Sequence, residues 1–87
     1  MIRSENFLLQ EVAGSQVVVP LGVAVASFSG LITLNEAGVI LWNTLAQECT
    51  KQDLVNALTS QYEVSEAQAA EDVDRFLEKL RQVGAVK

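Results

Sequence analysis

Few of the side chains in this 87-residue sequence are suited to catalysis. It contains no histidine, which excludes a Ser-His triad and any histidine-bound metal within the chain. Its one cysteine, Cys49, has no second thiol as a partner, so we expect a passive residue rather than a nucleophile. The carboxylates of Glu71, Asp72 and Asp74 point in different directions around a helix and do not converge on a metal. We therefore expect no enzymatic activity, no cofactor and no bound metal.

Composition and charge restrict the partners of the chain. Its length supports one hydrophobic core, so we predict a single domain over residues 1–87. The net charge of −5 disfavours nucleic acid and anionic membranes as partners. A lone cysteine suits a reducing compartment, and the first residues do not form a signal peptide, so we expect a cytoplasmic protein. The hydrophobic share of 49% has two interpretations, a dense core or an apolar surface that a partner covers.

The first 35 residues predict a small β-sheet. Phe7–Val12 and Gln16–Val19 are strand-length runs joined by a turn at Ala13-Gly14-Ser15, which together predict a β-hairpin. Pro20 ends the second run because it has no N–H for a strand ladder. Phe28–Leu34 predicts a third strand. The stretch from residue 12 to residue 35 has no charge, but its proline and glycines break it into pieces too short to span a membrane.

The segment after the third strand predicts a helix from Glu36 to Leu45. Asn35 is a favourable N-cap, and the helix is apolar almost all the way round, which places it in the centre of the protein. Trp42 is therefore expected in the core rather than in a binding site. Gly38 costs about 1 kcal/mol relative to alanine within a helix, so we expect it to let another element approach closely.

Two further helices follow, each with a recognisable start. Thr50 and Asp53 approximate a capping box for the second helix, and Ser65 caps the third, which ends at Gly84. The apolar stripe of the second helix consists of Leu54, Leu58 and Tyr62. On the outer face of the third helix, Arg75 lies four residues after Glu71. We expect five large side chains to be mostly buried, namely Trp42, Leu45, Leu58, Phe76 and Leu80.

The element order predicts an α+β fold similar to a winged helix-turn-helix, with a three-stranded antiparallel sheet before three helices (β-β-β-α-α-α). Proteins with that architecture often bind DNA through their last helix. Here residues 65–83 carry five acidic side chains and three basic ones, and phosphates would repel such a helix. A DNA-binding regulator is therefore one alternative function, and a structural subunit that forms a homodimer is another.

Three short motifs occur in a characteristic order. The most specific is ITLNE at residues 32–36, followed by Trp42, and it is supported by Tyr62-x-Val64 and by Asp72-Val73-x-x-Phe76-Leu77. With them, residues 6–86 resemble the pyrroloquinoline quinone biosynthesis protein D family. Members of that family are also called recognition elements for ribosomally synthesised and post-translationally modified peptides (RiPPs). The family serves many pathways, so the resemblance does not imply synthesis of the quinone cofactor itself.

The resemblance implies a non-catalytic peptide chaperone. Such a protein binds the leader segment of a precursor peptide and presents it to a modifying enzyme, for which a radical SAM enzyme is one candidate. The leader adds as a further strand to the third strand and packs against the third helix. By position, the implied peptide-binding residues are Phe28, Ser29, Gly30, Leu31, Ile32, Thr33 and Leu34 in the strand, and Asp72, Arg75, Phe76 and Lys79 on the helix.

The residue types at these positions suit such a site. Phe28, Leu31 and Ile32 make the third strand apolar and uncharged, and an exposed edge of that kind pairs readily with another strand. Arg75 and Lys79 lie one helical turn apart, within reach of acidic residues in a leader. The alternative is that the N-terminal segment of the chain, or a second copy, covers this edge.

Overall fold

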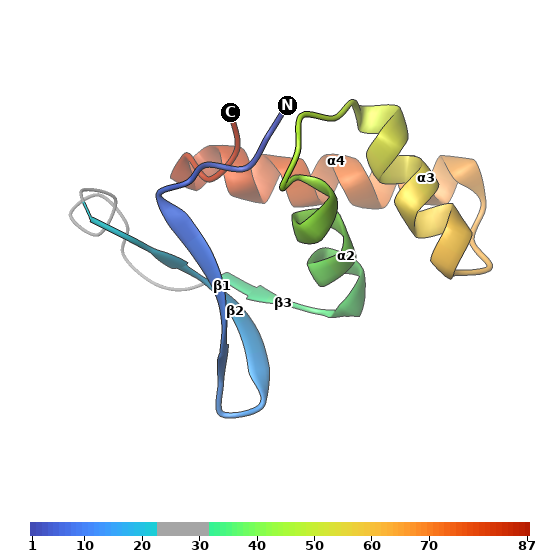
Figure 1. Ribbon diagram of the computed structural model, residues 1–87. Coiled ribbons are helices and arrows are strands. Elements are labelled where there is room, and N and C mark those ends of the chain that lie inside the picture. The colour runs from blue at the N-terminus through green and yellow to red at the C-terminus, as the bar shows by residue number, and fades with distance from the viewer. Residues whose placement is uncertain (23–31) are drawn as a thin grey trace.

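The computed structural model of the protein describes residues 1–22 and 32–87, in which three strands precede three helices (Figure 1). The strands are β1 (Phe7–Val12), β2 (Ser15–Pro20) and β3 (Ile32–Leu34), and the helices are α2 (Glu36–Thr44), α3 (Lys51–Gln61) and α4 (Glu66–Val83). This order confirms the predicted α+β arrangement. No helix in this part of the chain is both long enough and apolar enough to cross a lipid bilayer.

The strands form one antiparallel sheet with β2 in the middle. β1 pairs with β2 along its full length, and the two central residues of the turn, Ala13 and Gly14, both have positive φ values of 51° and 81°. Such a two-residue turn matches the natural twist of a hairpin. β2 also pairs with β3, with Val18 opposite Ile32. The first part of the predicted third strand, Phe28–Leu31, lies outside the described residues.

The helix α2 begins at a sharp corner directly after β3. The Asn35 side chain caps it as predicted, since its Oδ1 accepts a hydrogen bond from the Gly38 N–H at 2.9 Å. Gly38 also faces the end of β3, because a Cβ added there would lie only 3.2 Å from the Cβ of Leu34. A side chain at this position would push the two elements apart, which confirms the predicted reason for a glycine here.

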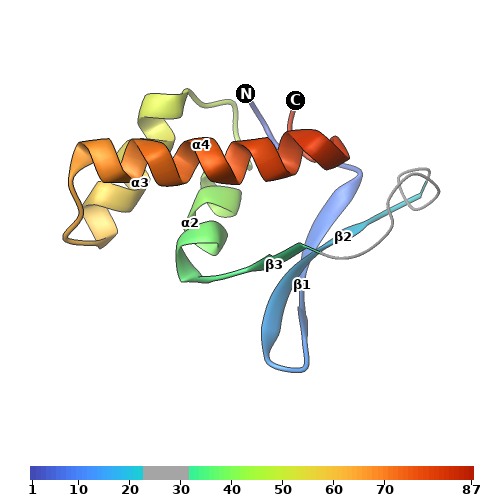
Figure 2. The same cartoon turned by 180° about the vertical axis from the view of Figure 1, so that it is seen from behind.

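The two longer helices are capped as the sequence predicts. Thr50 and Asp53 form a complete capping box at the start of α3, and the Ser65 hydroxyl accepts a hydrogen bond from the backbone of Gln68 at the start of α4. Gly84, in the left-handed conformation, ends α4. The helices α3 and α4 pack against each other, and Figure 2 shows α4 running across both α2 and α3.

The prediction for Tyr62 was wrong. Helical periodicity predicts that Tyr62 belongs to the buried stripe of the second helix, yet 37% of its surface is exposed. The helix α3 ends at Gln61, and the backbone of Tyr62 is extended, so its side chain no longer follows the helical stripe of Leu54 and Leu58. On α4, the ion pair of Arg75 is formed with Asp72, three residues away, rather than with Glu71. Both spacings place two side chains on one face of a helix.

The segment before β1 is joined to the helices through Arg3. Its backbone pairs with that of Val86, and its guanidinium carbon lies 5.2 Å from the centroid of the Trp42 ring. The same guanidinium donates a hydrogen bond to the Trp42 carbonyl oxygen at 3.0 Å. This carbonyl belongs to the last turn of α2, where carbonyl oxygens lack an N–H donor from a following turn of the helix. Arg3 supplies that donor, and its positive charge is favourable at the negative end of the helix dipole.

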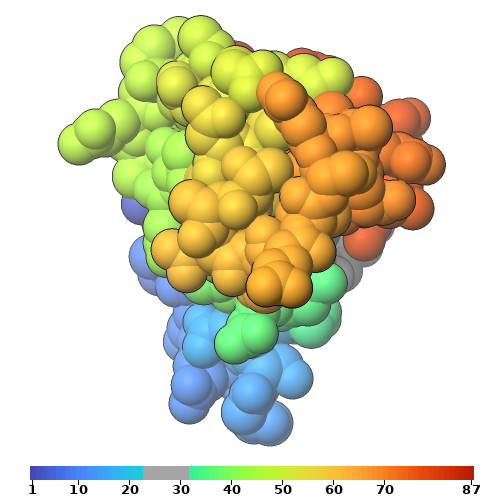
Figure 3. Space-filling model, turned by 90° about the vertical axis from the view of Figure 1, so that its right-hand side faces the viewer, coloured from blue at the N-terminus to red at the C-terminus, as the bar shows by residue number. Residues whose placement is uncertain are grey.

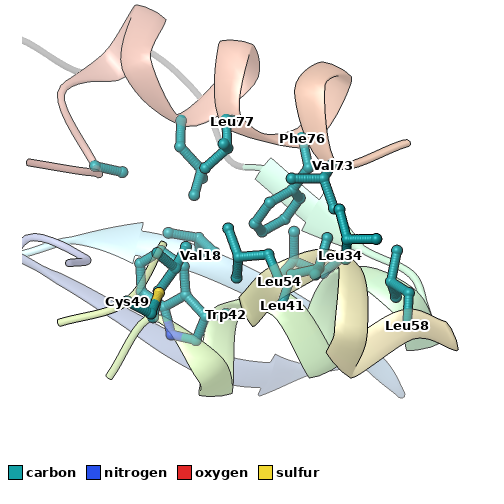
Figure 4. Close-up of a cluster of buried hydrophobic side chains, with 14 of the residues drawn as sticks. Val18, Leu34, Leu41, Trp42, Cys49, Leu54, Leu58, Val73, Phe76 and Leu77 are labelled. Carbon is teal, nitrogen blue, oxygen red and sulfur yellow. The ribbon is translucent and has the colours of Figure 1, made fainter. Parts of the chain in front are cut away.

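One hydrophobic cluster takes side chains from every strand and helix (Figure 4). The five residues predicted to be buried, Trp42, Leu45, Leu58, Phe76 and Leu80, all belong to it. Leu80 and Leu45 have no exposed surface, and the cluster continues past α4 to Ala85. The inward faces assigned from periodicity are therefore confirmed for α2, α3 and α4, apart from Tyr62.

Replacing a fully buried leucine tests this packing. Leu80→Ala should lower the free energy of unfolding by about 2–5 kcal/mol, because it removes apolar contacts and leaves a cavity. Urea unfolding monitored by circular dichroism measures the change in the free energy of unfolding. The exposed neighbour Glu78 provides the control, since Glu78→Ala should change stability by less than about 0.5 kcal/mol. A comparably small effect of Leu80→Ala would contradict the assigned inward face of α4.

Candidate functional site

The third strand has one edge without a partner strand. It pairs with β2 on one side only, and no strand of residues 1–22 or 32–87 pairs with its other edge. Within this strand Leu34 is buried, Ile32 is half-buried and Thr33 is exposed. With respect to these described residues, the outer edge therefore has no strand partner for its backbone N–H and C=O groups, which is the property that makes edge strands prone to pairing.

A groove of about 610 Å³ lies beside this edge, between β3 with the start of α2 on one side and α4 on the other. It is lined by Thr33, Leu34, Asn35, Ala37, Gly38, Leu41, Leu58, Asp72, Arg75, Phe76 and Lys79. Figure 2 shows β3 and α4 on the same side of the molecule. Residues distant in sequence thus meet in a single surface feature.

The groove has an apolar floor that belongs to the core. Leu34, Leu41, Leu58 and Phe76 line it, and all four are buried members of the hydrophobic cluster. Figure 4 shows Leu34 and Phe76 where α4 faces the end of β3. Phe76 and Leu34 keep 9% and 8% of their surface exposed and Leu41 and Leu58 only 2%, so the groove reaches only the outer edge of the core. An apolar side chain placed here would lose water contact on most of its surface.

The charges of the rim are already partly neutralised within the protein. The guanidinium of Arg75 forms an ion pair with the Asp72 carboxylate, which also accepts a hydrogen bond from the Gln68 side chain at 3.1 Å. Lys79, one turn beyond Arg75, is exposed and has no ion pair with any described residue. Among the described residues that line the groove, the positive charge without an ion pair is therefore that of Lys79.

A second hollow of about 420 Å³ continues the groove past the start of α2. The two share Asn35, Ala37, Leu58 and Asp72 in their walls. The second one adds the residues Glu36, Tyr62 and Val64. The exposed position of Tyr62, which periodicity did not predict, thus gives this hollow an aromatic wall.

Of the eleven implied peptide-binding residues, six line the groove together: Thr33, Leu34, Asp72, Arg75, Phe76 and Lys79. Ile32 belongs to the same strand but is not part of the lining. Phe28, Ser29, Gly30 and Leu31 lie outside the described residues. The sequence interpretation missed Asn35, Ala37, Gly38, Leu41 and Leu58 as part of the wall. Only Gly38 carried a signal, because its small size pointed to a close approach.

The chemical groups of the described residues are those of a binding surface. No group of three or more carboxylate, thiol or imidazole side chains lies close enough to hold a metal ion in residues 1–22 and 32–87. Cys49 is buried away from the groove, and its burial raises the pKa of the thiol. A raised pKa keeps the thiol protonated and weakly nucleophilic near neutral pH. An apolar floor, a charged rim and an open strand edge can bind a chain but offer no evident nucleophile.

Comparison with known proteins gives two similarities. The sequence profile of the family described as "Coenzyme PQQ synthesis protein D (PqqD)" matches residues 8–86. No curated protein matches this sequence. The fold is similar to the solved structure "TbiB1 in Complex with the TbiA(beta) Leader Peptide", with a TM-score of 0.78 and 18% sequence identity. That similarity covers 100% of this chain and 95% of the other, and at this identity it shows the shared fold.

The buried thiol gives a prediction that needs no ligand. Ellman's reagent should react slowly with Cys49 in the folded protein at pH 8 and rapidly after unfolding in guanidinium, because burial raises the pKa of the thiol and blocks access. A raised pKa in the folded state stabilises the fold while the thiol is neutral, and this contribution is lost as the pH rises through that folded pKa. Cys49→Ser should remove this loss of stability at alkaline pH. Equally fast labelling of the folded protein would contradict the passive role.

Proposed function

The chain belongs to the coenzyme PQQ synthesis protein D (PqqD) family, and we propose that it is a peptide-binding adaptor rather than an enzyme. In this proposal it binds the leader segment of a ribosomally synthesised precursor and presents it to a modifying enzyme, for which a radical SAM enzyme remains one candidate. The observation that carries the proposal is the groove between the open edge of β3 and α4. The leader peptide bound to TbiB1, a protein of the same fold, supports a peptide as the ligand class.

In the proposed complex the leader adds to β3 as an antiparallel strand. The sheet is antiparallel throughout, and antiparallel pairing is slightly more stable per residue than parallel pairing. Backbone hydrogen bonds then form along the open edge. Successive side chains of the leader point to opposite faces, so every second one enters the groove and meets the apolar floor around Leu34 and Phe76.

The apolar floor should contribute more to affinity than the rim charges. Burying one leucine- or phenylalanine-sized side chain stabilises a complex by about 1.5–3 kcal/mol. An exposed ion pair with Lys79 contributes only about 0.2–1 kcal/mol, because water and salt screen it. The pair between Arg75 and Asp72 reduces the attraction further, since Arg75 must leave its own carboxylate to meet one in the leader. Lys79 should therefore contribute more to selectivity among peptides than to affinity.

The two alternative functions make different use of the same surface. A DNA reader would place α4 against phosphates, yet the exposed positions of this helix include the acidic residues Glu66, Glu71, Asp74 and Glu78. These carboxylates disfavour that function. A structural homodimer would instead pair the open edge of β3 with that of a second copy. The mass of the free protein across a range of concentrations, measured by sedimentation, distinguishes this from peptide binding. The cytoplasmic location remains a prediction.

Titration of the isotope-labelled protein with a synthetic leader peptide tests the proposal. The sequence of the leader is taken from a precursor gene adjacent to the gene of this protein. Backbone amide shifts in two-dimensional NMR spectra should concentrate at Ile32–Leu34 and Asp72–Lys79. Lys79→Glu should weaken binding of an acidic leader by roughly three- to tenfold, because it replaces attraction with repulsion. Arg81→Glu is the matched control, since it makes the same charge change on the same helix away from the groove lining.

Two outcomes would contradict the proposal. One is the absence of binding at millimolar leader concentration. The other is a set of shifts confined to the β1–β2 hairpin, which would place the peptide at the opposite edge of the sheet. Equal effects of Lys79→Glu and Arg81→Glu would show that only the net charge of the protein matters and would remove Lys79 from the site.

A further inference from the structure

The groove beside β3 does not end where the strand ends. The second hollow shares four wall residues with it and opens toward Tyr62, the residue directly after α3. Figure 3 shows this side of the molecule, with the end of α3 and the start of α4 (yellow to orange) above the start of α2 (green). The two hollows are therefore parts of one continuous depression that passes the first turn of α2.

The direction of the peptide in the proposed complex determines which part of it reaches this extension. In an antiparallel pair, the residues that precede the added strand lie beyond the C-terminal end of β3, next to Asn35 and Glu36. An extended chain advances about 3.3 Å per residue, so two or three residues upstream of the strand are enough to enter the second hollow. Its occupant is thus the upstream segment of the same peptide.

The walls of the second hollow combine apolar surface with negative charge. Ala37, Leu58, Tyr62 and Val64 provide the apolar part. Among the described residues of its lining, the charged groups are the carboxylates of Glu36 and Asp72, with no lysine or arginine. Asp72 is already paired with Arg75.

Glu36 is the carboxylate of this hollow that remains available. It is exposed and forms no ion pair with any described residue. Beside it, the backbone of Tyr62 is held at both its polar groups, because its N–H donates to the Leu58 carbonyl at 2.9 Å and its carbonyl accepts from the Val64 N–H at 3.0 Å. An exposed ring on a fixed backbone next to a free carboxylate is a suitable arrangement for a guanidinium group.

We propose that the upstream segment of the bound peptide places an arginine in this second hollow, with its aliphatic stem along Tyr62 and its guanidinium at Glu36. The proposal rests on the proposed function and specifies its ligand further. A guanidinium stacks on an aromatic face and pairs with a carboxylate in a planar geometry, whereas the stem of the side chain covers apolar surface. With Lys79 at the other end, the site selects peptides that are basic before the added strand and acidic along it.

Selection from a phage-displayed library of random 16-residue peptides tests this without knowledge of the natural ligand. Peptides selected on the wild-type protein should share an arginine upstream of an alternating apolar segment. This preference should disappear when the selection is repeated on Glu36→Gln or Tyr62→Ala. It should persist on Leu8→Ala, the matched control, because Leu8 is also a large exposed apolar residue (48%) but lies on β1, outside both hollows.

Calorimetry with one selected peptide then measures the contact itself. Replacing its upstream arginine by alanine should weaken binding to the wild-type protein about three- to fivefold and weaken binding to Glu36→Gln clearly less, because only the contact with Tyr62 remains there. Equal losses on both proteins would overturn the arginine site. If the same peptide still shifts the amides of β3 and α4, the proposed function stands without it. Failure of the wild-type protein to select any peptide that shifts those amides would overturn both.

Discussion

The packing of Leu34 against Gly38 is the contact on which the arrangement of sheet and helices depends. The end of β3 and the first turn of α2 approach so closely that a single added carbon would lie 3.2 Å from the Leu34 side chain. Asn35, between them, turns the chain and satisfies the free N–H of Gly38. Leu34 thereby reaches the core, and β3 stays beside the helices instead of following the hairpin away from them. A larger residue at position 38 would force Leu34 to shift by a few tenths of an ångström, which would change the corner and the groove wall together.

This corner also explains why a binding groove coexists with so small a core. β3 is paired with β2 on one side, and its other edge faces the groove that separates it from α4. Phe76 and Leu58 serve two purposes, since each belongs to the core cluster and to the groove floor. A peptide in the groove, as proposed, would therefore contact side chains that the core already requires. Among the described residues, the large hydrophobic side chains that remain exposed are Leu8, Val12, Leu21 and Tyr62, and only Tyr62 adjoins the groove.

Charged side chains lie at both ends and in the middle of the depression. Lys79 marks one end, the internal pair of Asp72 and Arg75 lies between, and Glu36 marks the other end. The central pair is nearly neutral, so it neither attracts nor repels strongly. In the proposed complex, affinity comes mainly from backbone pairing and apolar contacts, whereas the charges at the two ends favour one direction and register of the peptide. Such a division suits an adaptor, because modest charge contacts exposed to water can be broken when the peptide is transferred.

Features that depend on neighbours along the chain can be predicted from the amino-acid sequence. Caps at Asn35, Thr50 and Ser65, the order of the elements and most of the inward-facing residues follow from local hydrogen bonding and from helical or strand periodicity. Periodicity failed at Tyr62 because it assumes that the helix continues, and the helix stops one residue earlier. Two features became evident only in the folded protein: Leu58 and Gly38 line one groove with Phe76, and Arg75 is paired with Asp72. Such contacts depend on how separate elements pack and on which of several equally spaced partners is nearest, and no pattern along one segment carries that information.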